Sequence, residues 1–112
     1  MEIELLNNKK CKLVITIVKK GMGSKVVEAA KKAGAKGGTI IFGRGTADKN
    51  IYLDILGMNY EPEKEVIFII VRENITDNIL DAITKECHME KPGRGIAFVM
   101  PLKGLEGIYH HV

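Results

Sequence analysis

Three short glycine-rich segments hold the residues best suited to chemistry in this sequence. They read "GAKGGT" at residues 34–39, "GRGT" at 43–46 and "PGRG" at 92–95. Glycine lets backbone N–H groups approach an anion closely, arginine adds a charged bidentate donor, and threonine adds a hydroxyl. Any one segment is better explained as a plain turn, since the sequence has neither a Walker nor a GxGxxG pattern. The three together, with Arg44 and Arg94 each centred between glycines, favour an anionic ligand such as a phosphate.

Other candidate sites are weaker. His88 beside Cys87, and His110 and His111 in the tail, could bind a soft metal. A helix-end histidine next to a core cysteine, and a solvated tail, explain them better. Ser24 is the only serine and fits a helix N-cap rather than a nucleophile. Acidic residues on or beside one long loop would do acid–base work or simply be solvated: Asp48, Asp54, Glu61, Glu63 and Glu65. The sequence therefore predicts neither an enzyme nor a metal site.

Composition excludes several functional classes. The chain has 112 residues, which suits a single domain over 1–112. Its 17 basic and 14 acidic residues give a net charge of +3, too balanced to indicate nucleic-acid binding. There are two cysteines without a CxxC pair, no signal peptide and no apolar run of membrane-spanning length. We expect a cytoplasmic protein that does not insert into membranes.

The pattern of apolar residues predicts the fold. Ser24 and Thr76 are expected to cap two helices, the first over 25–33 with Gly34 as its stop. Apolar, β-branched runs predict four strands, at 12–18, 35–42, 64–72 and 96–100. The order strand–helix–strand, repeated, predicts an α+β, ferredoxin-like βαββαβ fold. It has a four-stranded antiparallel sheet, two helices on one face and a long loop between strands 2 and 3.

The strands at 12–18 and 64–72 are apolar on both faces, although two helices cover only one. A monomer would expose a large apolar patch, which soluble proteins avoid. We expect a symmetric homo-oligomer with the sheets facing inward. In the alternative, the loop or the tail folds over the sheet.

The same residues resemble a known family. The order "KLVITIVKKG", "GAKGGTIIFGRG", a long loop, "PEKEVIFIIV", a helix and "GRGIAFVMPLKGLEGI" is similar to the PII nitrogen-regulatory signal-transduction family, especially its divergent members. The resemblance runs from Lys12 to Ile108. It implies a homotrimer that binds ATP, ADP or AMP in clefts between subunits. It also implies that residues 43–62 form a T-loop, which contacts a target protein such as an ammonium transporter or an enzyme of nitrogen assimilation.

The resemblance assigns binding residues position by position. Gly37 and Thr39 match the family's small residue and threonine beside the adenine. Gly43 and Arg44 match the Gly-Arg at the start of the T-loop, and Gly93 and Gly95 match the glycines of the phosphate-binding loop. The neighbouring Gly38, Gly45 and Arg94 are expected to belong to the same nucleotide site. Lys103 is the cation that remains after the last strand. In the loop, the expected partner-binding residues are Thr46, Asp48, Tyr52 and Leu56.

Two departures from the family pattern bear on the ligand. The usual Gly-Asp-Gly-Lys is "GRGI" here, so that Arg94 replaces the acid and Ile96 replaces the lysine. Arg94 would supply the lost charge. Gly45 stands where the family has glutamine, which weakens an expectation of 2-oxoglutarate sensing.

We therefore predict a non-enzymatic regulator that binds adenine nucleotides and acts through a flexible loop. The alternative is a CutA-type metal-binding trimer, in which Cys87, His88 or the tail histidines would be ligands. A small ferredoxin-like enzyme that uses the loop acids is the third hypothesis.

Overall fold

A computed structural model of the chain describes residues 11–46 and 62–107. In chain order these residues form β1 (Cys11–Lys19), α1 (Gly23–Lys32), β2 (Thr39–Arg44), β3 (Glu63–Arg72), the short 3-10 helix η3 (Glu73–Ile75), α2 (Thr76–Glu86) and β4 (Ile96–Pro101). All neighbouring strands pair antiparallel, and their order across the sheet is β2-β3-β1-β4. The predicted ferredoxin-like βαββαβ fold is confirmed, with its long connection between β2 and β3.

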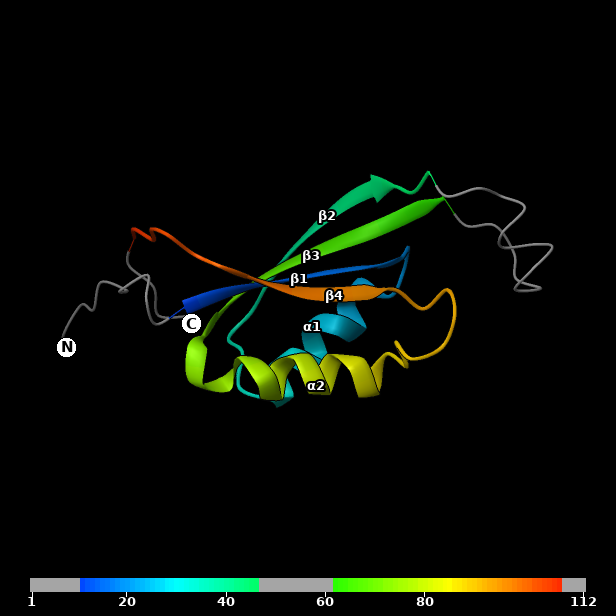
Figure 1. Cartoon of the computed structure of the whole chain (residues 1–112). Coiled ribbons are helices and arrows are strands. Elements are labelled where there is room, and N and C mark those ends of the chain that lie inside the picture. The colour runs from blue at the N-terminus through cyan, green and yellow to red at the C-terminus, as the bar shows by residue number, and fades with distance from the viewer. Residues whose placement is uncertain (1–10, 47–61, 108–112) are drawn as a thin grey trace.

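The sheet forms one layer, and both α-helices lie against the same face of it (Figure 1). On this face, Val14 of β1 lies opposite Ile69 of β3 and Val99 of β4. Val14 and Ile69 are fully buried, and Val99 packs against the same apolar cluster. Because alternate residues of a strand point to opposite faces, this register decides which side chains form the core.

The helix starts differ from the prediction. α1 begins at Gly23, Met22 precedes it, and no side chain at that N-cap position bonds to the helix. Ser24 lies inside the first turn, so its predicted role as N-cap is wrong. Thr76 is the first residue of α2 rather than its cap, and its hydroxyl donates to the carbonyl oxygen of Arg72 at 2.9 Å. Both predicted caps fail because the chain enters each helix earlier than its local sequence indicates.

The helix ends follow the prediction more closely. Gly34 follows α1 with a φ of 115°, and the N–H of Ala35 donates to the carbonyl oxygen of Ala30 at 3.0 Å. This is a Schellman motif, which satisfies carbonyl groups that the helix leaves unpaired. α2 ends in the same way, but the left-handed position is taken by His88, with a φ of 54°. Cys87 is fully buried beside it, as expected of a core cysteine next to a helix-end histidine.

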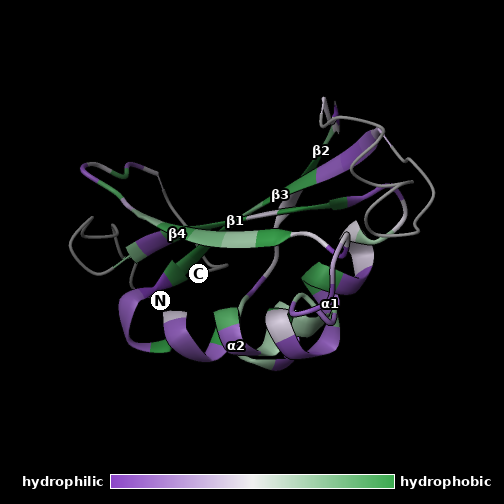
Figure 2. Ribbon diagram, turned by 45° about the vertical axis from the view of Figure 1, so that its right-hand side comes forward, coloured by the Kyte–Doolittle hydropathy of each residue, from purple (hydrophilic) through white to green (hydrophobic). Residues whose placement is uncertain are grey.

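The face of the sheet opposite the helices is apolar. Ile15 of β1 lies opposite Phe68 of β3 and Phe98 of β4, and the rows on either side are apolar too. Figure 2 shows mainly hydrophobic residues along the strands and a mixture of hydrophobic and hydrophilic residues on the helices. Ile96 is 58% exposed and Met100 45% exposed. The apolar side chains on this face, called the open sheet face below, are those of Leu13, Ile15, Ile17, Ile41, Val66, Phe68, Ile70, Ile96, Phe98 and Met100. The expectation that both faces of the sheet are apolar is confirmed.

Candidate anion-binding site

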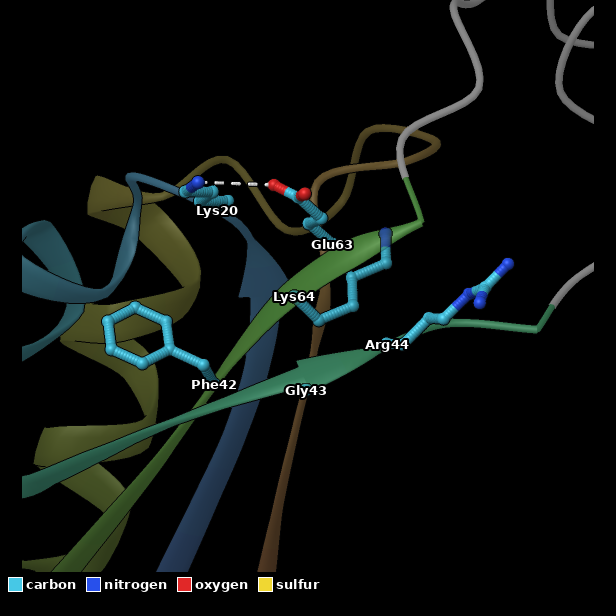
Figure 3. A pocket seen from close by; sticks show the side chains of 6 residues that line it. All are labelled: Lys20, Phe42, Gly43, Arg44, Glu63 and Lys64. Atoms are coloured by element: carbon cyan, nitrogen blue, oxygen red, sulfur yellow. Dashed lines mark ion pairs between the residues drawn. The ribbon is translucent and has the colours of Figure 1, made fainter.

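Two hollows lie at one end of the sheet, where β1 and β2 end and β3 and β4 begin. The larger, of about 580 Å³, is lined by Lys20, Phe42, Gly43, Arg44, Glu63 and Lys64 (Figure 3). The smaller, of about 260 Å³, is lined by Ile17, Val18, Lys19, Lys64, Gly93, Gly95 and Ile96. Lys64 borders both hollows. The two Gly-Arg-Gly segments, from opposite edges of the sheet, therefore reach the same end of it.

The strand register places cations side by side at this end. Gly43 lies opposite Lys64 on β3, and Lys64 lies opposite Lys19 on β1. Like charges directly opposite each other on neighbouring strands repel, and an anion placed between them would relieve that repulsion. Figure 3 shows the side chains of Lys64 and Arg44 both extending toward the ends of their strands. The arrangement is suited to a negatively charged ligand.

Acidic side chains offset this positive charge only partly. The carboxylate of Glu63 lies 3.2 Å from the ammonium group of Lys20, and both side chains are mostly exposed. Exposed pairs of this kind are weak because water screens them. Glu65 is buried, and its carboxylate accepts hydrogen bonds from the backbone of Gly21 and Gly23. Among the described residues that line the two hollows, cations therefore outnumber carboxylates.

The segment 93–95 has a backbone that favours glycine. Gly93 has a φ of 75° and Gly95 a φ of 135°. A side chain at Gly95 would place its Cβ 2.5 Å from the carbonyl oxygen of Ile17 and 2.9 Å from Cγ1 of Val18. Gly95 thus lets β4 approach β1 closely, whether or not a ligand is bound.

The described residues offer little to a metal or to covalent catalysis. Among residues 11–46 and 62–107, no group of three or more His, Cys, Asp or Glu side chains is placed to hold a metal ion. Burial raises the pKa of the Cys11 and Cys87 thiols, although nearby positive charges partly oppose the shift. A buried thiol with a raised pKa is a poor nucleophile and a poor ligand. His110 and His111 lie outside the described residues, and the described helices include none able to span a membrane.

The sequence of the chain matches the profile of one protein family over most of its length. The sequence profile described as "Nitrogen regulatory protein P-II" matches residues 11–111. The chain belongs to the P-II family. A comparison with curated proteins gives no match.

Solved P-II structures share the fold. The chain is similar to the structure of CPII bound to ADP, AMP and acetate from Thiomonas intermedia K12, with a TM-score of 0.62 and 19% identity over 88% of each chain. It is similar to Arabidopsis thaliana PII bound to citrate, with a TM-score of 0.64 and 23% identity over 88% of this chain and 87% of that one. A PII-like signalling protein from Thermus thermophilus gives a TM-score of 0.59 and 27% identity over 87% of each chain. With the family match over residues 11–111, these likenesses do not favour the CutA-type alternative.

The structure of this P-II protein brings some of the predicted site residues together and leaves others apart. Gly43 and Arg44 lie in β2 and line the larger hollow, while Gly93 and Gly95 line the smaller one. Gly45 follows Arg44 at the end of β2, and its N–H donates to the carbonyl oxygen of Pro62. These residues gather at one end of the sheet.

The second group of predicted P-II residues lies elsewhere in the subunit. Thr39 begins β2 opposite Phe68, in the middle of β3, and Gly37 and Gly38 precede it. Lys103 follows the far end of β4. A single subunit brings neither Lys103 nor the segment 37–39 to the two hollows. Thr46 is the last described residue before the gap in the loop, and Asp48, Tyr52 and Leu56 lie outside the described residues.

Arg94 has a contact that the sequence did not indicate. Its Nε donates to the carbonyl oxygen of Cys87 at 3.1 Å, so the side chain bonds to the C-terminal end of α2. Arg94 lines neither hollow, unlike its glycine neighbours. A cation at this position stabilises the helix end by bonding to a free carbonyl group.

Sequence reasoning missed three lysines that line the hollows, namely Lys19, Lys20 and Lys64. A signal for them was present: the pair 19–20 directly follows the strand predicted at 12–18, and Lys64 begins the strand predicted at 64–72. Adjacent antiparallel strands bring such positions to the same end of a sheet. Glu65 was also missed as a structural residue, because it was grouped with the acids of the loop.

Proposed function

We propose that this P-II protein binds an adenine nucleotide in clefts between the subunits of a homotrimer. It acts in the cytoplasm as a non-enzymatic regulator of a nitrogen-metabolism enzyme or transporter, through the loop between β2 and β3, which begins after Arg44 rather than at residue 43. One observation carries the proposal: two hollows meet at one end of the sheet, share Lys64, and are bordered by four cations and one carboxylate. The CPII structure with ADP and AMP supports the choice of ligand.

The open sheet face supports the trimer. Large side chains there, including Ile96 and Phe98, are exposed in a single subunit. Packing this face against other subunits would remove it from water and stabilise the assembly by about 25 cal/mol per Å² of apolar area buried. Gly37–Thr39 and Lys103, which lie away from the hollows within one subunit, would then be supplied to a cleft by the neighbouring subunit.

The ligand would bind mainly through its phosphates. Backbone N–H groups at 93–95 and the ammonium groups of Lys19 and Lys64 would approach phosphate oxygens, and Phe42 would border the larger hollow. Arg44 and Lys64 lie beside the points where the chain enters and leaves the loop. Ligand contacts at these two strand ends would favour one loop conformation and so transmit the bound state to a partner.

Calorimetric titration with ATP, ADP and AMP tests this proposal. We expect binding of at least one nucleotide. Lys19→Ala should weaken it about tenfold, because a hydrogen bond to a charged group contributes about 1.5 kcal/mol or more. Lys85→Ala is the matched control, since Lys85 lies on α2 and pairs with Asp81; its affinity should stay within about twofold of wild type.

Two results would refute the proposal. If wild-type protein binds none of the three nucleotides, its ligand is not an adenine nucleotide. If analytical ultracentrifugation shows a monomer, clefts between subunits do not exist.

A further inference from the structure

The N-terminus of α1 is capped by a side chain from a distant strand. Glu65 of β3 is only 8% exposed. Its Oε1 accepts a hydrogen bond from the N–H of Gly23 at 2.6 Å, and its Oε2 accepts one from the N–H of Gly21 at 3.1 Å. The two contacts join residues 42 and 44 positions apart in the sequence. They tie the turn after β1 to β3.

This carboxylate replaces a local cap. The N-cap residue Met22 has no side-chain hydrogen bond to the helix. The first N–H groups of a helix lack partners within it, and a carboxylate stabilises them through hydrogen bonds and through the helix dipole. The fit leaves no room for a side chain at position 23, because a Cβ on Gly23 would overlap Oε1 of Glu65.

The turn that Glu65 holds carries cations of the candidate site. The N–H of Lys20 donates to the carbonyl oxygen of Glu63 at 3.1 Å, and the N–H of Met22 donates to that of Lys19 at 3.1 Å. Lys19 lines the smaller hollow and Lys20 the larger one. The position of Lys20 relative to Lys64 therefore depends on how the turn is held against β3, whereas Lys19 already lies opposite Lys64 in the sheet.

We propose that Glu65 is a positioning residue for the anion site: it fixes the turn from Lys20 to Gly23, so that Lys20 lies at the larger hollow. The identity of the anion rests on the proposed function above. Glu65 itself lines neither hollow and acts through the backbone of the turn.

The sign of the effect separates positioning from plain electrostatics. Glu65 carries a negative charge close to a site for anions. If its charge were its only influence, Glu65→Gln would strengthen anion binding by removing a repulsive charge. If Glu65 positions Lys20 through the turn, the same substitution weakens binding, since the glutamine N–H₂ group cannot accept a hydrogen bond from a backbone N–H.

The first experiment needs no ligand. We expect the amide hydrogens of Gly21 and Gly23 to exchange faster with solvent in Glu65→Gln than in wild type, measured by NMR on the full chain. Glu86→Gln makes the same chemical change at an exposed residue of α2 and should leave both exchange rates unaltered. Unchanged exchange in Glu65→Gln overturns the role of Glu65 in holding the turn.

The second experiment is calorimetric titration with ADP. Glu65→Gln should lower the affinity roughly tenfold, as expected when a charge-assisted hydrogen bond that orders a site is lost, and Glu86→Gln should bind as wild type does. Equal or tighter ADP binding by Glu65→Gln overturns the positioning role. If wild-type protein does not bind ADP, ADP is not the ligand. The exchange rates of Gly21 and Gly23 then still show whether Glu65 holds the turn.

A second variant covers the case in which Glu65→Gln does not fold. Gly23→Ala keeps the charge of Glu65 but pushes its carboxylate away from the helix end. It should also weaken ADP binding, whereas Glu65→Asp, which keeps a shorter carboxylate, should bind more tightly than Glu65→Gln. Gly23→Ala that binds ADP as wild type does contradicts the proposal.

Discussion

Substitution of Gly95 by alanine tests the geometry at the junction of β1 and β4. Gly95 precedes β4 and has a φ of 135°. A Cβ there would lie 2.5 Å from the carbonyl oxygen of Ile17, well inside ordinary van der Waals contact, which begins at 3.4 Å. The nearest atom belongs to the backbone, so it cannot move aside as the end of a flexible side chain would. The steric overlap can be removed only if β4 shifts away from β1.

The expected loss of stability has two parts. Forcing a non-glycine residue into left-handed backbone costs about 1–2 kcal/mol. Overpacking of this kind costs about 1–3 kcal/mol more, because strands must shift. We expect Gly95→Ala to lower the free energy of unfolding by about 3 kcal/mol, and the melting temperature by roughly 13 °C for a domain of this size.

Urea unfolding at fixed subunit concentration measures this change, since assembly makes stability depend on concentration. Gly104→Ala is the matched control: nothing lies within 4 Å of a Cβ at Gly104, and its φ does not require glycine. The control should stay within about 0.5 kcal/mol of wild type. If Gly95→Ala and Gly104→Ala unfold at the same urea concentration, β4 does not approach β1 as described.

Two further substitutions should stabilise the protein, as measured by urea unfolding. The hydroxyl of Thr16 is buried and has no hydrogen-bond partner in the described part of the chain. Thr16→Val should therefore add about 1 kcal/mol by removing an unsatisfied polar group, whereas Thr16→Ser, which keeps the hydroxyl, should lower stability; a destabilised Thr16→Val would mean that the hydroxyl has a partner. His88 occupies the left-handed position after α2, so His88→Gly should add about 0.5–1 kcal/mol. His88→Ala should add nothing, and an equal gain from both variants would argue against backbone strain as the cause.

Long apolar runs made the central strands predictable. The strands expected at 12–18 and 64–72 became β1 (Cys11–Lys19) and β3 (Glu63–Arg72). β2 was harder, because it begins at Thr39 rather than at residue 35 and continues through Arg44. Gly38 explains part of this difference: a Cβ there would lie 2.9 Å from Cγ1 of Ile69, so the chain crosses β3 closely before pairing begins.

The helix starts show the limit of local patterns. Ser24 and Thr76 have the right chemistry for caps, yet neither caps its helix. The side chain that accepts a hydrogen bond from the first residue of α1 is that of Glu65, which belongs to β3. Capping preferences describe a helix with its own neighbours in sequence, and they cannot register an acceptor that only folding brings near.

The sequence by itself determined the element order, the ferredoxin-like fold, the apolar second face of the sheet and the resemblance to P-II. All of these follow from the periodicity of apolar residues and from the order of motifs, which depend only on the order of residues along the chain. Only the tertiary structure decided that Lys19, Lys20 and Lys64 stand together and that Arg94 bonds to the end of α2. Contacts between strand ends and helix ends depend on pairing register and on the angle at which each turn leaves its strand, and neither is encoded within a short segment.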